Sequence, residues 1–254
     1  MSSSGLVLDT LQLYLNSSSA DRYNNDSNCD VEFYLPLIEA NSQCYIHISV
    51  QNISIPYSFY NCNSSNNILR YNLNSSPDEI ITVIIPVGNY NINTLKSYLQ
   101  SVLTGFTLSY NSTNNRYTFY NSTTNFTILS SSTCLAMLGF KNNISLSSVN
   151  RTLTSAICCD LTTTKAIYIC SSFPSVNISK AKVSDNNIIA SLPVDVSPFS
   201  LLTFSNYNNY RFNTFANIMS NLAIRLTDQN GNLLDLNGCE WSMTLQLDII
   251  DYVN

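Results

Sequence analysis

"NLAIRLTDQNGNLLDLNGCEWSMTLQLDII", residues 221–250, decides the fold class, because it holds two segments in which apolar and polar residues alternate. In the first segment Leu222, Ile224 and Leu226 share one side, and Arg225 lies on the other. The same alternation runs through residues 243–249. A period of two is typical of a strand with one buried face. The Asn-Gly pair at 230–231 favours a tight turn, so the stretch predicts a β-hairpin.

Strand patterns of the same kind recur along the chain. They are found in "CDVEFYLP" (29–36), "CYIHISVQNISIPYSFY" (44–60), "DEIITVIIP" (78–86) and "KAIYICSS" (165–172). We expect eight or more strands in total, and two facing sheets with Greek-key connections can bury their apolar faces. The sequence therefore predicts an all-β protein with a single jelly roll. A generic two-sheet sandwich is the alternative.

One segment interrupts the strands with a helical pattern. In "NINTLKSYLQSVL" (91–103), Leu95, Leu99 and Leu103 recur at helical spacing. Asn93 or Thr94 can cap its start, and Gly105 follows its end. A hairpin pattern follows over 106–129. We therefore expect one domain over 1–254, with a small helix-plus-hairpin subdomain inserted at 80–140.

The composition is polar but poorly charged. Charged residues are 11% of the chain, against about 25% in ordinary soluble proteins. Such a surface suits packing against neighbouring subunits, because few charges lose water there. AT-rich codon bias is the alternative explanation, although lysine is scarce. The net charge of −5 and the lack of a basic cluster argue against a nucleic-acid surface.

The sequence predicts neither a transmembrane segment nor a signal peptide. Its longest apolar runs, such as "IITVII" (80–85), are far shorter than the ~20 residues that a membrane span needs. The first residues, "MSSSGLVLDT", lack the basic start of a signal peptide.

Reactive chemistry is sparse, and we expect no enzyme, no catalytic residue and no cofactor. His47 is the one histidine, and it lies within a strand pattern, whereas nucleophilic catalysis needs a base beside Ser or Cys. A glycosidase would need paired carboxylates. We interpret the candidate acidic residues as turn or strand-end residues: Asp78, Glu79, Asp185, Asp195, Asp228, Asp235 and Glu240.

The sequence also contains little that indicates a metal site, and we expect none. Asp26, Asn28 and Asp30 alternate like a calcium loop, but the glycine and the distal glutamate of such a loop are missing. The eight cysteines form no Cys-x-x-Cys pair. We interpret them as buried, reduced thiols, with a disulfide framework as the alternative. The 16 Tyr and 11 Phe suit packing, and stacking on sugars is the alternative.

Four segments, taken in order, resemble one family of viral proteins. They are "SVQNISIPYSFYNCNSSNN" (49–67), "IPVGNYNINTLKSYLQSVL" (85–103), the 106–140 stretch ending in "LAMLGF", and the C-terminal 222–250 stretch. Together they resemble the penton, or vertex, proteins of virophages and polinton-like viruses. The resemblance spans residues 45–140 and 215–250, and residues 141–214 carry no recognisable motif of this family.

The resemblance implies a single jelly-roll capsid protein without enzymatic activity. Five copies would form a homopentamer at each icosahedral vertex, surrounded by double jelly-roll major capsid proteins. The chain would be found in the virion, assembled in the infected host cell. A minor or cement capsid protein and a carbohydrate-binding, receptor-attachment jelly roll are the alternatives.

Overall fold

The computed structural model describes residues 6–41, 43–173, 187–207, 211–214 and 217–251. These residues form two compact units. The jelly-roll unit consists of Met1–Phe59 and Thr164–Asn254, and the insert unit is Tyr60–Thr163. The predicted range 80–140 lies inside the insert unit, which extends beyond it on both sides. The division into one domain over 1–254 with a subdomain inserted at 80–140 stays a prediction.

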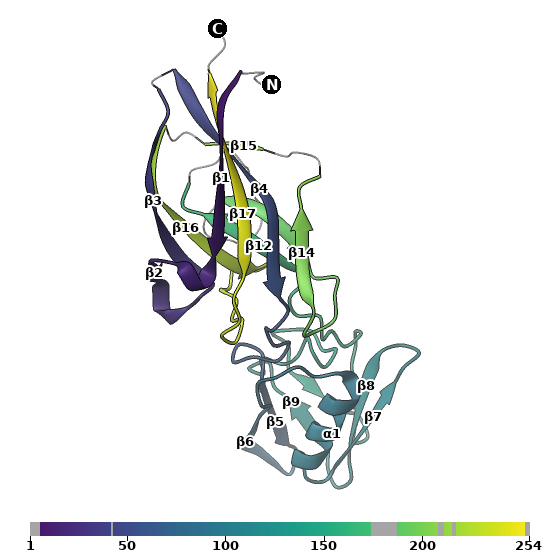
Figure 1. Cartoon of the computed structure of the whole chain (residues 1–254). Helices are drawn as coiled ribbons and strands as arrows, with labels where there is room; N and C mark the ends of the chain where they lie inside the picture. The colour runs from purple at the N-terminus through teal and green to yellow at the C-terminus, as the bar shows by residue number, and fades with distance from the viewer. Residues whose placement is uncertain (1–5, 42, 174–186, 208–210, 215–216, 252–254) are drawn as a thin grey trace. The chain divides into compact units, whose positions relative to one another are not determined.

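The jelly-roll unit contains two antiparallel sheets, shown in Figure 1. The first sheet has the order β1-β17-β4-β14, and the short β15 also pairs with β4. The second has the order β13-β12-β16-β3-β2. The strands are β1 (Val7–Asn16), β2 (Arg22–Tyr23), β3 (Asp30–Glu39), β4 (Cys44–Pro56), β12 (Ala166–Ser171), β13 (Ile188–Pro193), β14 (Leu201–Ser205), β15 (Phe212–Asn213), β16 (Ile218–Asp228) and β17 (Ser242–Asp251).

The order of the long strands is that of a single jelly roll. We number the strands of this unit along the chain and leave out the two-residue strands β2 and β15. The first, third, sixth and eighth strands (β1, β4, β14 and β17) then form one sheet. The second, fourth, fifth and seventh form the other. This arrangement results when a long antiparallel hairpin is folded over into two Greek keys. The predicted all-β fold class and the jelly roll are confirmed.

The inner faces of the two sheets share one core. Ile48 of β4 and Leu245 of β17 belong to the same buried cluster as Val31 of β3 and Ile169 of β12. The alternation of the sequence explains this core, because every second side chain of each strand points inward.

The predicted hairpin over 221–250 is wrong, because its two arms belong to different sheets. β16 pairs with β12 and β3, whereas β17 pairs with β1 and β4. The Asn-Gly turn does form, with Gly231 at φ +84°, but the returning chain makes only one bridge, from Leu233 to Thr227. Alternation shows that each strand buries one face. It does not show whether two strands pair edge to edge or pack face to face.

The insert unit combines two small sheets and one helix. Its sheets have the orders β10-β9-β5-β6 and β11-β8-β7. The elements are β5 (Ile68–Leu73), β6 (Ser76–Ile84), α1 (Ile92–Val102), β7 (Phe106–Asn111), β8 (Arg116–Asn121), β9 (Phe126–Ile128), β10 (Leu146–Ser147) and β11 (Thr152–Thr154). Leu95 and Leu99 of α1 are buried in a core with Leu69, Phe119 and Phe126. No helix among the described residues is long and apolar enough to cross a membrane.

The helix begins at a cap other than the two predicted. The side chain of Asn91 accepts hydrogen bonds from the backbone N–H groups of Asn93 and Thr94, both at 2.9 Å. The hydroxyl of Thr94 in turn accepts from the backbone N–H of Asn91 at 2.9 Å. This reciprocal pair is a capping box, in which the predicted Thr94 is the third helical residue and Asn91 is the cap.

Candidate functional site

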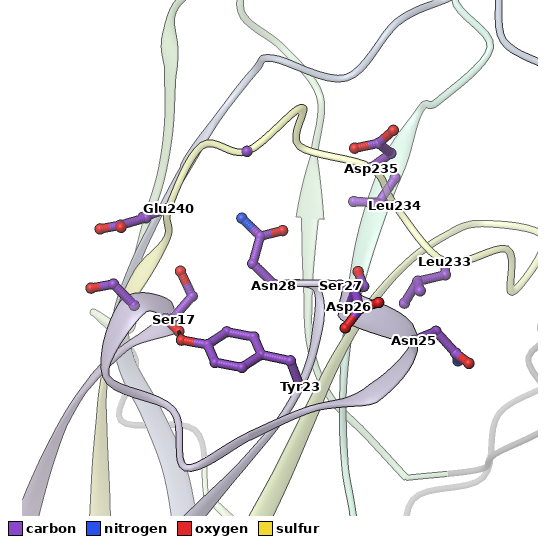
Figure 2. Close-up of a pocket in the computed structure, with 12 residues that line it drawn as sticks. Ser17, Tyr23, Asn25, Asp26, Ser27, Asn28, Leu233, Leu234, Asp235 and Glu240 are labelled. Atoms are coloured by element: carbon purple, nitrogen blue, oxygen red, sulfur yellow. Dashed lines mark hydrogen bonds between the residues drawn. The ribbon is translucent and has the colours of Figure 1, made fainter.

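A pocket of about 680 Å³ opens in the jelly-roll unit, where the chain between β1 and β3 meets the loop before β17 (Figure 2). Two short 3-10 helices, η1 (Ser17–Ser19) and η2 (Asn24–Asp26), contribute to its lining. It is lined by Ser17, Ser18, Tyr23, Asn25, Asp26, Ser27, Asn28, Leu233, Leu234, Asp235, Gly238 and Glu240. The lining therefore contains hydroxyl, amide and carboxylate groups, and neither lysine nor arginine.

Hydrogen bonds hold the pocket walls in place. The Tyr23 hydroxyl donates to the carbonyl of Ser17 at 2.8 Å. The indole N–H of Trp241 donates to the carbonyl of Asn28 at 2.7 Å, and the Asn28 amide donates to the carbonyl of Cys239. In Figure 2 the Asn28 side chain points into the space between Glu240 and Asp235. The walls are thus fixed to the buried Trp241.

The calcium-like trio is separated by the fold. Asp26 and Asn28 line the pocket. Asp30 is engaged elsewhere, since it accepts from the Asn24 amide at 3.0 Å and lies 3.7 Å from the Arg225 guanidinium. Within the described ranges, no group of three or more His, Cys, Asp or Glu side chains could hold a metal ion.

The other acidic residues have different surroundings. Asp235 and Glu240 join Asp26 in the pocket lining, a proximity that no spacing in the sequence indicates. Asp228 accepts from the backbone N–H groups of Asn230 and Asn232 as a turn residue. Asp195, Asp78 and Glu79 are exposed, the last two in β6, and Asp185 lies outside the described residues.

His47 lies in the middle of a sheet. Its register partners are Asp248 on β17 and Asn213 on β15, and its ring lies 4.9 Å from that of Tyr45. Asp248 is not a free carboxylate that could orient the imidazole, because Arg211 forms an ion pair with it at 3.1 Å. The Thr10 hydroxyl also donates to Asp248, at 2.8 Å. The sequence does not reveal this ion pair of a buried Asp248 carboxylate with a partly exposed Arg211, because Asp248 follows the pattern of an outward-facing polar residue.

The cysteines differ in exposure, and all eight are free. Five are buried, and Cys159 is half-buried. Cys158 and Cys239 are exposed, which the interpretation of buried thiols did not foresee. Burial removes the thiolate from water, and it raises the pKa of Cys29 and Cys134 to about 12.

We therefore expect thiol labelling of the native protein near pH 8 to be selective. Cys158 and Cys239 should react quickly, whereas Cys29 and Cys134 should react more slowly by at least about a hundredfold, because they are buried and hardly ionised. Mass spectrometry after pulse labelling identifies the sites. In denaturant without reductant all eight thiols should be labelled, and a result of none would show a disulfide framework instead.

Apolar side chains are also exposed at both edges of the first sheet. At the β1 edge Tyr14 is 77% exposed, and Leu8 is exposed further along the same strand. At the β14 edge Phe199 is 82% and Tyr207 93% exposed, flanking the exposed Leu201. β1 and β14 lie at opposite ends of the strand order, so these are two different surfaces. We call them the β1 edge (Leu6, Leu8, Tyr14) and the β14 edge (Phe199, Leu201, Tyr207).

Comparison with known proteins gives similarity at the level of solved structures only. No protein-family model matches the sequence, and no curated protein matches it. The mavirus penton protein is similar at 12% identity and a TM-score of 0.45, covering 95% of this chain and 100% of its own. A chain of the Sputnik virophage structure is similar at 12% identity and a TM-score of 0.43, covering 96% of this chain and 98% of its own. Similarity at this identity and TM-score carries no argument, so the jelly roll rests on the strand order of this chain.

Proposed function

We propose that this chain is a structural capsid protein that forms homopentamers at the five-fold vertices of an icosahedral virion. Its partners are four further copies of itself and the surrounding double jelly-roll major capsid proteins. It assembles in the infected host cell and acts without catalysis or cofactor.

The observation that carries the proposal is the pair of apolar edges on one sheet. A ring of five subunits is built from head-to-tail contacts, so each subunit needs two different adhesive surfaces. The β1 edge and the β14 edge are two such surfaces, each with large exposed apolar side chains. Burying such side chains contributes roughly 25 cal/mol per Å² of apolar surface. The jelly-roll strand order and the four resembling segments support the same function.

The first test is the native mass of the chain. A pentamer has 5 × 28.3 kDa, or 141.5 kDa. We expect this mass by native mass spectrometry or light scattering at high protein concentration. A trimer would favour the receptor-attachment alternative. A chain that stays monomeric even at the highest concentration would contradict the pentamer.

Mixing two edge variants tests the head-to-tail geometry. Tyr14→Asp should disable the β1 edge and Leu201→Asp the β14 edge, so each variant alone should lose the ring. Mixed together they keep one intact contact, between the β14 edge of the first and the β1 edge of the second, and should form heterodimers that grow no further. Tyr34→Asp, at an exposed tyrosine of the second sheet, is the matched control and should still form the ring.

The pocket of Figure 2 favours one alternative, the carbohydrate-binding jelly roll. Hydroxyl, amide and carboxylate groups beside the Tyr23 ring are the groups that bind sugar hydroxyls and stack on sugar faces. A glycan array would detect this activity. If binding is lost in Asn28→Ala while the pentamer persists, the pocket is the site of a second function on the same subunit.

A further inference from the structure

The two sheets of the insert unit have four edges, and one differs from the rest. β10 has two residues and β11 has three, so neither offers a long row of backbone groups. β7 has six residues and β6 has nine. Long edge strands are sites of pairing with other chains unless something covers them.

The edge of β7 is covered by the helix of the same unit. The side-chain amide of Gln100 donates to the carbonyl of Phe106 at 2.6 Å. Its oxygen accepts from the backbone N–H of Leu108 at 2.7 Å. Gln100 therefore occupies the backbone groups that a further strand would need.

The edge of β6 is open over most of its length. Ile85 donates to the carbonyl of Asn67 at 2.8 Å, so odd-numbered residues of this segment bond toward β5. The even-numbered Ile80, Thr82 and Ile84 direct their backbone groups the other way. The Tyr98 hydroxyl donates to the carbonyl of Ile84 at 2.9 Å. Among the described residues, no hydrogen bond reaches the backbone of Ile80 or Thr82.

The side chains along this edge are apolar. Ile80 is 58% and Ile84 62% exposed, with the exposed Thr82 between them. Ile81 and Val83 point the opposite way and pack on the core of the insert unit. β6 thus presents the unpaired backbone groups of Ile80 and Thr82 together with β-branched side chains, which is what a pairing strand requires.

The order Ile80, Thr82, Ile84 reads the same in both directions about Thr82. Two copies of β6, antiparallel about a two-fold axis at Thr82, would place Ile80 opposite Ile84, and Thr82 opposite itself. In this register the pairs 80–84 and 82–82 join residues whose backbone groups point to the open edge. The Ile84 carbonyl would accept from the second copy in addition to the Tyr98 hydroxyl, since a carbonyl oxygen has two lone pairs. The acidic Asp78 would lie opposite Pro86 of the second copy, so like charges do not meet.

We propose that β6 pairs with β6 of a second copy of this chain, antiparallel and two-fold about Thr82. The contact joins two four-stranded sheets into one across the axis. It is isologous, unlike the head-to-tail contact of the proposed pentamer, and it uses no residue of the β1 or β14 edges. The proposal therefore goes beyond the proposed function and stands independently of it.

Cysteine cross-linking of the full-length protein tests the register. Thr82→Cys places the two sulfurs of a pair on the axis, where the ~5.5 Å Cα separation of a hydrogen-bonded pair suits a disulfide. Mild oxidation should give a species of 2 × 28.3 kDa, or 56.6 kDa, joined through position 82. Wild type reports the background of the native cysteines. Thr107→Cys, on the exposed side of the Gln100-covered β7, is the matched control and should not exceed it.

A charge at the same position tests the energetics. Thr82→Lys sets two ammonium groups against each other and should weaken the two-fold association by at least about tenfold in Kd. Thr107→Lys adds the same charge on β7 and should change nothing. Sedimentation measures both. Equal cross-linking of the two cysteine variants, or wild-type association of Thr82→Lys, would overturn the proposal.

The result of the cross-linking test can be distinguished from the result of the pentamer test. Tyr14→Asp should abolish the ring and still allow the Thr82→Cys cross-link. A protein that forms rings without the cross-link would retain the proposed function and refute this contact. A protein that cross-links without forming rings would support this contact and contradict the proposed pentamer.

Discussion

Replacing Gly139 with alanine should destabilise the insert unit by several kcal/mol, roughly 2–5. Gly139 has φ +78°, and a Cβ there would lie 2.4 Å from the carbonyl oxygen of Ile157. The left-handed conformation costs an alanine about 1–2 kcal/mol. The overlap adds a cost of overpacking, typically about 1–3 kcal/mol, because the obstacle is backbone and cannot rotate away. The Ile157 amide also donates to the carbonyl of Gly139 at 3.0 Å, so the two segments cannot separate freely.

Gly105→Ala is the matched control. Gly105 belongs to the same unit and has φ +79°, but a Cβ there meets nothing closer than 3.8 Å. This variant should lose only the conformational part, about 1–2 kcal/mol. Hydrogen exchange of the α1 and β8 amides in increasing urea measures both, since these elements report on the insert unit. Equal losses in the two variants would show that the contact with Ile157 does not matter.

Replacing Trp241 with alanine should cost the jelly-roll unit about 3–5 kcal/mol, the usual range for a large buried aromatic residue. Trp241 is 1% exposed, and its ring meets Phe33 edge to face, with centroids 6.3 Å apart. Trp241 begins the approach to β17 in one sheet, and Phe33 belongs to β3 in the other. The indole therefore joins the two sheets, and its N–H also fixes Asn28 at the pocket wall.

Two further variants separate these contributions. Trp241→Phe keeps most of the apolar volume and loses the bond to Asn28, so it should cost less than alanine. Tyr34→Ala removes a 61% exposed aromatic residue that belongs to neither apolar edge, and it should change the stability by less than about 0.5 kcal/mol. Circular dichroism during urea unfolding measures all three. A small loss in Trp241→Ala would mean that the sheets are held together elsewhere.

The sequence predicted the elements that depend on local periodicity. Residues 44–56 alternate and form β4, and the Leu95–Leu99 spacing gives α1. The fold class followed from these patterns, because strands with one apolar face must pack in two layers. The cap was misplaced because Asn91, Asn93 and Thr94 all have side chains that can cap. Only the backbone conformation at Asn91 distinguishes them.

What could not be predicted depends on contacts between distant segments. The alternation of 222–226 and 243–249 is equally compatible with a hairpin and with opposite sheets. Asp248 alternates like an exposed residue, yet Arg211 and Thr10 enclose it from other parts of the chain. The pocket likewise brings Asp26 beside Asp235 and Glu240. No spacing in the sequence shows such proximity, so these features needed the structure.

The strand order also has a consequence for how the chain folds during synthesis. β1 and β4 both pair with β17, and β3 pairs with β16, so these early strands wait for partners that are synthesised much later. The insert unit is continuous in sequence and can complete both of its sheets as soon as it emerges. Non-local pairings of this kind close slowly, and unpaired strands are prone to aggregation meanwhile. A nascent chain stalled once residue 163 has left the ribosome exit tunnel should therefore carry an insert that resists protease. Its N-terminal strands should still be digestible and still need a chaperone.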